Sequence, residues 1–405
     1  MAPDTAPIPA AARPAIGLVL TGGGARAAYQ VGVLHALAGL LPSGAPSPFP
    51  IICGTSAGAI NAAALACGAN DFRRTVHELA QVWRGFRTHQ VYRSDALGVM
   101  RTGVRWVSAL LLGGLGRHNP TSLLDNAPLG RLLAERLYFP GIQRGIQGGH
   151  LHALSITASA YASGESVSFC QGAPGLRGWR RARRVGLFTT LGVEHLLASS
   201  ALPFIFPAVR IHREYFGDGS MRQIAPLSPA LHLGAQRLLV IGTGRAWGQP
   251  AERVRAAGYP SLAQIAGHAL NSIFLDQLET DLERLQRINR TIALVPSHVL
   301  RESGLELKPV EVFTLLPSAA LESIAARHTK DLPRPIRTLF RGIGAVGSSG
   351  STLASYLLFE RRYCRAVMRL GYADAMERKQ DLLDFLGVQR ESEEVPVTLD
   401  ESVQD

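Results

Sequence analysis

The sequence feature that most constrains the fold is a run of five mostly small residues, Gly54–Gly58, with the sequence Gly-Thr-Ser-Ala-Gly and Ser56 at its centre. An apolar run, Phe49–Cys53, precedes it, and an alanine-rich run, Ala59–Ala66, follows it. This order predicts a strand, a sharp turn and a helix. A side chain on either flanking glycine would collide with the neighbouring strand or helix. The turn would project the serine hydroxyl out of the sheet, close to the positive end of the helix.

The motif alone leaves two interpretations of Ser56 open. A Gly-x-Ser-x-Gly turn between a strand and a helix is typical of a nucleophilic serine. The same pattern also arises as a purely structural turn, and glycine makes up 42 of the 405 residues, so an accidental match is not rare. Ser56 is therefore a candidate nucleophile, and its activating base has to be sought elsewhere in the chain.

A second strand–loop–helix unit precedes the first. Ile16–Leu20 reads as a short buried strand, Gly22-Gly23-Gly24 as a loop, and Ala27–Leu41 as a helix with apolar residues at helical spacing. The two units predict an α/β sheet with parallel strands. The loop has neither the spacing of a dinucleotide site nor the lysine of a Walker loop. Its free backbone N–H groups suit a developing oxyanion, and Arg26 either orients the loop or contacts a phosphate.

Composition limits the classes of protein and of partner. The 405 residues are 46% hydrophobic and 18% charged, which is enough for a large globular core. The net charge of +11 favours anionic surfaces such as phospholipid headgroups, and the chain lacks a nucleic-acid-binding signature, so no nucleic-acid partner is expected. Four widely spaced cysteines predict reduced thiols in a cytoplasmic protein, and no metal or other cofactor is expected. No apolar run is long enough for a transmembrane helix. Peripheral contact with the inner membrane surface and the oligomeric state stay open.

The remaining patterns predict further elements. Residues 91–118 hold about a dozen apolar residues flanked by arginines, and they form either an interfacial cap over an acyl site or an ordinary core helix. The apolar segment Pro203–Pro207 suits the lining of a pocket. Strands are expected at 151–160, 164–169, 214–216, 238–242 and 291–295, and helices at 71–90, 121–137, 193–200, 261–290, 309–329 and 351–372.

The base that would activate Ser56 is also open from the residues themselves. Asp218 stands between two glycines directly after an expected strand, where a short acidic side chain can reach across the edge of the sheet. Asp-Gly is equally a common turn pair. In a triad, His268 or His328 would follow the acid in chain order, although none of the twelve histidines lies in a glycine-flanked loop after a strand. In a dyad, the carboxylate alone takes the proton.

Taken together, these motifs resemble the patatin-like phospholipases. The resemblance rests on the glycine loop with Arg26, on the Gly54–Gly58 turn and on Asp218-Gly219, in that order, and it covers about residues 15–245. The segments Ala198–Pro203 and Pro226–Ala230 also resemble family segments that flank the aspartate. Two positions depart from the family pattern. Ser220 stands where glycine or alanine is usual, and Ala27 stands where glycine is usual. Neither departure removes a reacting group.

The resemblance implies a three-layer α/β fold with a central mixed, mostly parallel sheet. It also implies a serine carboxylic-ester hydrolase of the phospholipase A, lysophospholipase or esterase type. Such an enzyme acts on lipid or at a membrane surface without metal. It implies Ser56 as nucleophile, Asp218 as base, and an oxyanion hole from the amides of Gly23 and Gly24, in a loop shaped by Gly22 and Arg26. The expected organisation is a disordered leader at 1–14, a catalytic domain at 15–245, a mainly helical region at 246–390 and an acidic disordered tail at 391–405.

Overall fold

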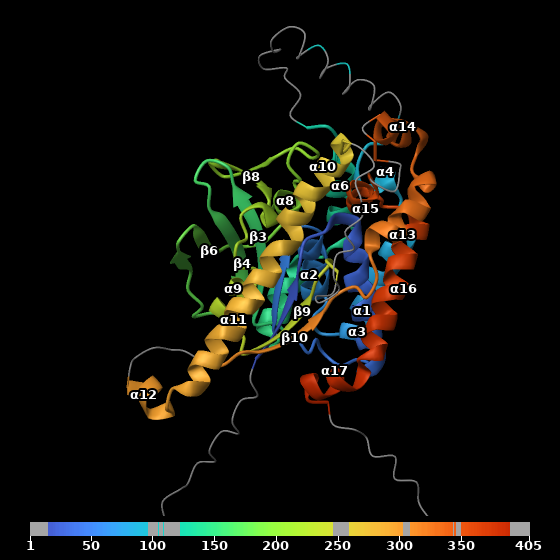
Figure 1. The fold of residues 1–405 in the computed structure, drawn as a ribbon. Helices are drawn as coiled ribbons and strands as arrows, with labels where there is room; N and C mark the ends of the chain where they lie inside the picture. Colours follow the sequence, from blue (N-terminus) through green and yellow to red (C-terminus); the bar gives the residue numbers. More distant parts are fainter. Residues whose placement is uncertain are drawn as a thin grey trace, which may run out of the picture.

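The computed structural model describes residues 15–95, 104, 108, 122–245, 259–302, 308–342, 344–345 and 350–388. The expected leader at 1–14, the tail at 391–405 and nearly all of the apolar segment within 91–118 lie outside these residues. The described part of the chain builds a ten-stranded sheet with helices on both faces. Figure 1 shows the sheet between a group of helices formed by both ends of the sequence and a long helix that crosses its other face.

The centre of the sheet is parallel. β1 (Ile16–Leu20) lies between β2 (Ile51–Thr55) and β9 (Arg237–Ile241), and β3 (Ala153–Ala160) continues the sheet beyond β2. β10 (Glu311–Leu315) adds a parallel edge strand beside β9. The other strands make the sheet mixed; they are β4 (Ser166–Gly172), β5 (Trp179–Arg181), β6 (Arg184–Phe188), β7 (Val209–Ile211) and β8 (Glu214–Asp218). The predicted mixed, mostly parallel sheet is confirmed.

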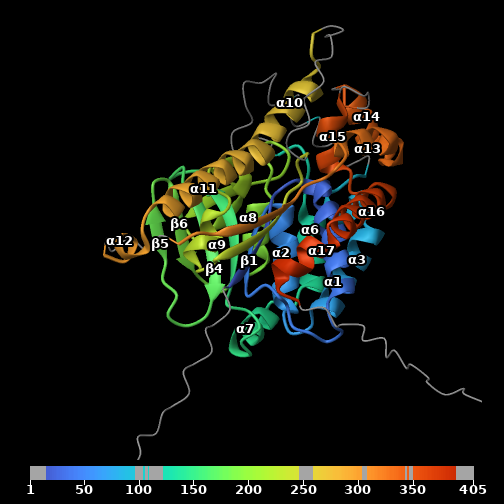
Figure 2. The same ribbon diagram turned by 60° about the horizontal axis from the view of Figure 1, so that its bottom comes forward.

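Successive side chains of the strands alternate between the two faces of the sheet and divide the hydrophobic core into two layers. Leu18 and Leu20 of β1 belong to the larger core, which is covered by α1 (Ala28–Leu40), α2 (Ala57–Cys67), α3 (Phe72–Gly85) and α16 (Arg361–Glu377). Val19 points to the opposite face, which is covered by α9 (Ser228–His232) and α11 (Gln277–Leu294). Successive side chains of a strand point to opposite faces, so one five-residue strand serves both cores. Figure 2 shows the two helical layers on either side of the sheet.

The shorter helical elements complete the described structure. They are η1 (Gly24–Ala27), α4 (Thr88–Val91), α6 (Ala127–Arg136), α7 (Pro140–Gln147), α8 (Val193–Ser199), η3 (Gly219–Met221), α10 (Leu262–Asn271), the π-helical turn η4 (Ser272–Asp276), α12 (Ser297–Glu302), α13 (Leu321–His328), η5 (Thr329–Asp331), α14 (Arg334–Gly342), α15 (Ser351–Leu357) and α17 (Lys379–Leu386). None of the helices in the described ranges combines the length and apolarity that crossing a bilayer requires.

The C-terminal region packs directly on the rest of the chain. α16 lies along α1, and glycines allow the two backbones to approach closely. A Cβ atom on Gly32 would collide with the carbonyl oxygen of Met368, and one on Gly371 with that of Tyr29. β10 extends the central sheet from the same region. The region after residue 245 is therefore part of the core on which the site is built.

Two expected elements in this region are wrong. Residues 311–315 were expected within a helix, but they form β10, because β9 offers a parallel edge to this β-branched and aromatic segment. Residues 291–295 were expected as a strand, but α11 continues through Leu294. Asn289 of α11 makes two hydrogen bonds with the backbone of Val310, so the helix end is tied to the chain that enters β10.

Several expected helices are shorter or divided. The 71–90 segment forms α3 and α4, the 121–137 segment contains α6 alone, and the 351–372 segment is divided between α15 and α16. The apolar segment Pro203–Pro207 has one buried and one exposed phenylalanine. Phe206 packs against Tyr92 in the core, whereas the side chain of Phe204 is 82% exposed.

Candidate active site

Ser56 occupies the sharp turn between β2 and α2. Its backbone has φ 55° and ψ −129°, a left-handed conformation that a residue with a side chain rarely adopts. The turn is tight because Gly54 and Gly58 each pack directly against backbone atoms. A Cβ atom on Gly54 would lie 2.5 Å from the carbonyl oxygen of Gly58, and one on Gly58 would collide with that of Leu20. The strand, sharp turn and helix expected around Ser56 are the observed geometry.

A buried serine holds the elbow in place. The backbone N–H of Ser56 donates to Oγ of Ser199 over 2.8 Å, and the Ser199 hydroxyl donates to the carbonyl oxygen of Thr157 over 2.6 Å. Ser199 is fully buried at the end of α8 and thereby ties the turn to β3. No sequence pattern singles out Ser199, although it lies in the Ala198–Pro203 segment, which resembles a family segment.

The register of the sheet brings Asp218 to Ser56. β3 pairs with β4 along one edge, and β2 and β8 meet end to end along its other edge. Thr55 pairs with Thr157, and Asp218 pairs with the next residue of β3, Ala158. The last residue of β8 therefore faces the turn that follows β2. Two residues 162 positions apart in the chain become neighbours because the two strands approach from opposite directions.

The Asp218 carboxylate is completely buried. Its Oδ1 accepts the backbone N–H of Ser220 over 2.9 Å, and its Oδ2 has no hydrogen bond within ordinary geometric limits. Burial raises the pKa of Asp218 from 3.8 to about 7, while weaker interactions with the Ser56 hydroxyl and with Ser220 oppose the rise. The Ser56 hydroxyl is thus close enough to favour the charged carboxylate without a well-formed hydrogen bond. Such a group can exchange a proton near neutral pH.

The residues after Asp218 explain the Asp-Gly-Ser sequence. A Cβ atom on Gly219 would collide with the carbonyl oxygen of Thr157, so glycine is required there. Ser220 lies against the glycine loop, because a Cβ atom on Gly22 would lie 2.5 Å from its Oγ. The serine that departs from the family pattern therefore sits between the carboxylate and the loop.

The glycine loop is held from both sides. Gly23 and Gly24 have φ values of 156° and 54°, which favour glycine. Thr243, after β9, donates its hydroxyl to the carbonyl oxygen of Gly22 over 2.6 Å. On the other side, a Cβ atom on Gly24 would collide with the carbonyl oxygen of Tyr356 in α15. The loop is therefore fixed by residues that follow it by more than two hundred positions.

Arg26 belongs to this clamp. Its side chain is 1% exposed, its Nε donates to Oγ of Ser355 over 2.7 Å, and its guanidinium lies 4.1 Å from the centre of the Tyr356 ring. One of its terminal nitrogens lies 3.8 Å from a carboxylate oxygen of Glu322. Of the two roles considered for Arg26, these contacts favour the orienting one.

The loop is also covered. Phe274, in the π-helical turn η4, lies so close that a Cβ atom on Gly22 would be 2.7 Å from its ring. The Phe274 ring stacks on Tyr356 with a centroid distance of 5.1 Å. Ser56 itself is only 2% exposed. Phe274 could not be singled out from the sequence, because it lies in an unremarkable apolar stretch of a long helical pattern.

Of the two histidines considered for a triad, His268 is exposed on α10 and His328 has another partner. In the described ranges, none of the hydrogen bonds of Ser56 or Asp218 involves a histidine. His328 pairs with Asp331 over 3.0 Å, His232 stacks on Trp179, and His195 accepts the backbone N–H of Gly192. The same residues contain no group of three His, Cys, Asp or Glu side chains that could hold a metal ion. Among the described residues, the Ser56–Asp218 pair is therefore the candidate for acid–base chemistry.

Comparisons with known proteins give matches to solved structures and to a family profile. Human GIVD cytosolic phospholipase A2 is similar to the chain at 13% identity, over 92% of this chain and 60% of that one, with a TM-score of 0.43. VipD from Legionella pneumophila is similar at 15% identity, over 85% and 66% of the two chains, with a TM-score of 0.29. The chain thus spans 60% and 66% of the lengths of these two structures. A comparison with curated protein sequences gives no significant match. The family profile described as patatin-like phospholipase matches residues 18–231, more than half of the sequence, and the chain belongs to this family.

Proposed function

We propose that the protein is a lipid acyl hydrolase that cleaves carboxylic ester bonds through a Ser56–Asp218 dyad. The observation that carries the proposal is the position of the Ser56 hydroxyl beside a buried carboxylate whose pKa is about 7. The carboxylate accepts the hydroxyl proton as the serine oxygen attacks the ester carbonyl carbon. The ester C–O bond then breaks, the alcohol leaves with the proton from Asp218, and the acyl group stays on Ser56. Water activated by the same carboxylate releases the fatty acid.

The glycine loop supplies the electrostatic part of the proposal. The tetrahedral intermediate carries a negative oxygen, and backbone N–H groups stabilise such an oxygen when they are oriented beforehand. The amide of Ser56 is engaged by Ser199, so we assign this role to the amides of Gly23 and Gly24. Gly22 and Arg26 keep the loop in shape. Ser56 is buried, so neighbouring groups have to move before a substrate reaches the serine, and we propose that Phe274, which lies against Gly22, is one of them.

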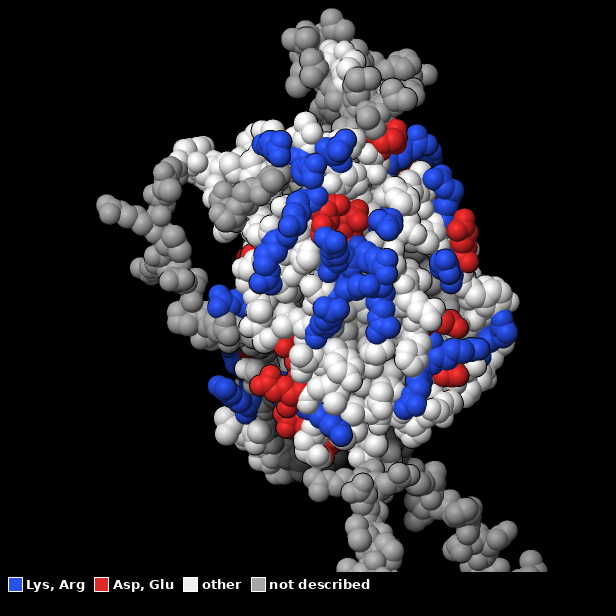
Figure 3. Space-filling model, turned by 90° about the vertical axis from the view of Figure 1, so that its right-hand side faces the viewer, with Lys and Arg blue, Asp and Glu red and all other residues white. Residues whose placement is uncertain are grey.

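A basic face supports contact with an anionic lipid surface. Figure 3 shows blue side chains gathered on the face of the molecule that carries α16. Arg84, Arg365 and Arg369 line a hollow there, together with His35 and Tyr372. Because such a surface attracts phospholipid headgroups, we propose peripheral binding of a cytoplasmic protein to the membrane that holds its substrate.

A fluorophosphonate probe tests the chemistry. The native protein should be labelled at Ser56, the Ser56→Ala and Asp218→Asn variants should lose labelling and hydrolysis of p-nitrophenyl esters, and Ser163→Ala, which changes an exposed serine, should behave as the native protein. If the Asp218→Asn variant kept nearly full activity, the dyad would be wrong. If native Ser56 is not labelled, the fold serves lipid binding without hydrolysis.

The class of lipid needs a separate experiment. Incubation with a mixed lipid extract, followed by mass spectrometry of the lipids that disappear, distinguishes phospholipids, lysophospholipids, neutral glycerides and simple esters. The Ser56→Ala protein is the control for each lipid.

A further inference from the structure

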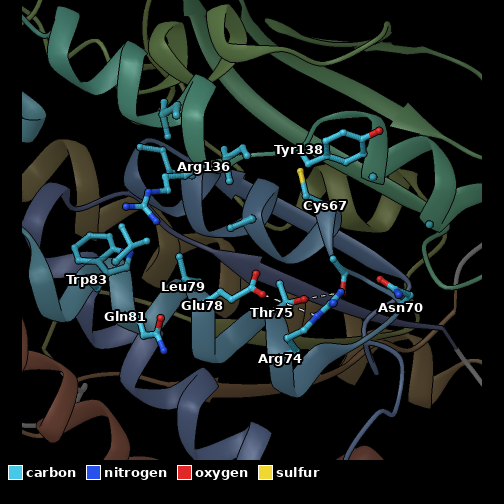
Figure 4. Close-up of a pocket in the computed structure, with 18 of the residues that line it drawn as sticks. Cys67, Asn70, Arg74, Thr75, Glu78, Leu79, Gln81, Trp83, Arg136 and Tyr138 are labelled. Atoms are coloured by element: carbon cyan, nitrogen blue, oxygen red, sulfur yellow. Dashed lines mark hydrogen bonds and ion pairs between the residues drawn. The ribbon is translucent and has the colours of Figure 1, made fainter.

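A cavity of about 800 Å³ lies beside α2, apart from the catalytic pair. It opens between α2 and α3 on one side and α6 and α7 on the other (Figure 4). Neither Ser56 nor Asp218 lines it. Its volume is in the range of small-molecule sites, roughly 300–1,000 Å³. Its walls are mostly apolar and include Ile60, Ala64, Leu79, Trp83, Leu132 and Leu133.

The cavity follows the helix that begins at the nucleophile. Ile60, Ala64 and Cys67 lie four, eight and eleven positions after Ser56, on one face of α2. At a rise of 1.5 Å per residue, they lie about 6, 12 and 17 Å beyond Ser56 along the helix axis. The α2 side of the cavity therefore begins about one turn beyond the serine. Its apolar walls suit a hydrocarbon chain.

The charged groups of the cavity favour an anion. Three arginines and one glutamate line it. Arg74 lies 4.0 Å from Glu78, and Arg144 lies over the Tyr138 ring at 4.5 Å. Arg136 is exposed at the rim of the cavity, and its guanidinium makes no ion pair or hydrogen bond with the residues that the structure describes. In Figure 4 its guanidinium extends from α6 toward the wall that carries Trp83. A positive group without a partner at the side of an apolar cavity is complementary to a carboxylate.

We propose that this cavity binds a long-chain fatty acid, with the hydrocarbon chain along α2 and the carboxylate on Arg136. The site is distinct from the place where an ester would react, because the ester carbonyl has to lie at Ser56. The inference goes beyond the proposed hydrolysis, and binding does not require it. A fatty acid held here would also contact the helix whose first turn follows the nucleophile.

The test is displacement of a fluorescent fatty acid by oleate, measured with the Ser56→Ala protein so that hydrolysis plays no part. Arg136→Ala should weaken oleate binding about tenfold, the effect of losing one charge-assisted hydrogen bond. Arg131→Ala is the matched control, because Arg131 is exposed on the same helix and does not line the cavity. Methyl oleate, which has no charge, should bind with the same affinity to the Ser56→Ala protein with and without the Arg136→Ala change. Equal oleate affinity of the Arg136→Ala and Arg131→Ala proteins would overturn the proposal.

A second measurement locates the ligand. Cys67 lines the cavity and is the one cysteine of the four that is partly exposed. Oleate should slow the reaction of Cys67 with a small thiol reagent at least severalfold, and Ala64→Trp, which fills the cavity, should abolish both oleate binding and this protection. An unchanged Cys67 rate at saturating oleate would place the ligand elsewhere. Tighter binding of lysophosphatidate than of oleate would assign the cavity to a phospholipid headgroup and overturn the assignment to a free acid.

Discussion

Because its carboxylate is buried, Asp218 should lower the free energy of unfolding as the pH rises to about 7. Its pKa is about 7 in the folded protein and has the ordinary value of 3.8 in the unfolded chain. The folded protein thus holds the proton more tightly, so the free energy of unfolding falls as the pH rises from 3.8 to about 7 and is constant above. Between pH 5 and pH 8, the free energy of unfolding falls only over the two units from pH 5 to about 7, and the fall amounts to about 3 kcal/mol.

Asp218→Asn should remove this loss. Asparagine has the same shape, its carbonyl can still accept the N–H of Ser220, and it carries no charge to desolvate. The variant should therefore gain about 3 kcal/mol relative to the native protein when the pH is raised from 5 to 8, or about 4 °C in melting temperature for a chain of this size. Urea unfolding at both pH values measures the difference directly.

The same ionisation should appear in catalysis with the opposite sign. The proposed mechanism needs the charged carboxylate, so kcat/KM should rise with pH through about 7 while stability falls. Ser56→Ala is the control, because it should lose activity but keep the pH-dependent fall in stability. An Asp218→Asn protein that shows the same loss of stability between pH 5 and pH 8 as the native protein would refute the reasoning.

Three further predictions concern the groups that hold the site. Ser199→Ala removes the acceptor of the Ser56 amide and the donor to a strand carbonyl, and it should cost about 2–3 kcal/mol in urea unfolding and lower kcat more than it changes KM. Gly24→Ala should cost about 2 kcal/mol or more, because its backbone is left-handed and the methyl group would meet the Tyr356 carbonyl; an unchanged melting curve would contradict this contact. Arg26→Ala should lower the melting temperature and fluorophosphonate labelling together, whereas full labelling of a folded variant would show that the glycine loop does not need its C-terminal anchor.

The local geometry of the site was predictable because it depends on residue size. Only glycine fits at positions 54 and 58, and the runs before and after them have unambiguous patterns. The meeting of β2 and β8 beside β3 was not predictable, because it depends on a pairing between segments about 60 residues apart or more. Asp218 could be proposed only from its glycine neighbours and from the resemblance. The catalytic roles of both residues stay predictions.

The C-terminal region was the least predictable part for a related reason. The β10 segment looks helical within its neighbourhood and becomes a strand only because β9 has a free edge. The end of α11 has β-branched residues but continues as a helix because its packing outweighs their weak preference. Arg26 was expected either to orient the loop or to contact a phosphate, and its burial depends on Ser355, 329 positions later.

That last contact has a consequence for the order in which the protein becomes active during synthesis. Both members of the proposed dyad have been made once Asp218 has been added, but the glycine loop obtains its anchor only after Ser355 and Tyr356 have left the ribosome. A nascent chain would thus expose the serine before it can stabilise an oxyanion. We expect a ribosome-bound chain that ends at residue 345 not to react with a fluorophosphonate, and one that exposes residue 388 to react. In the proposed enzyme, the long reach of Arg26 would then delay ester hydrolysis until the C-terminal helices have been made.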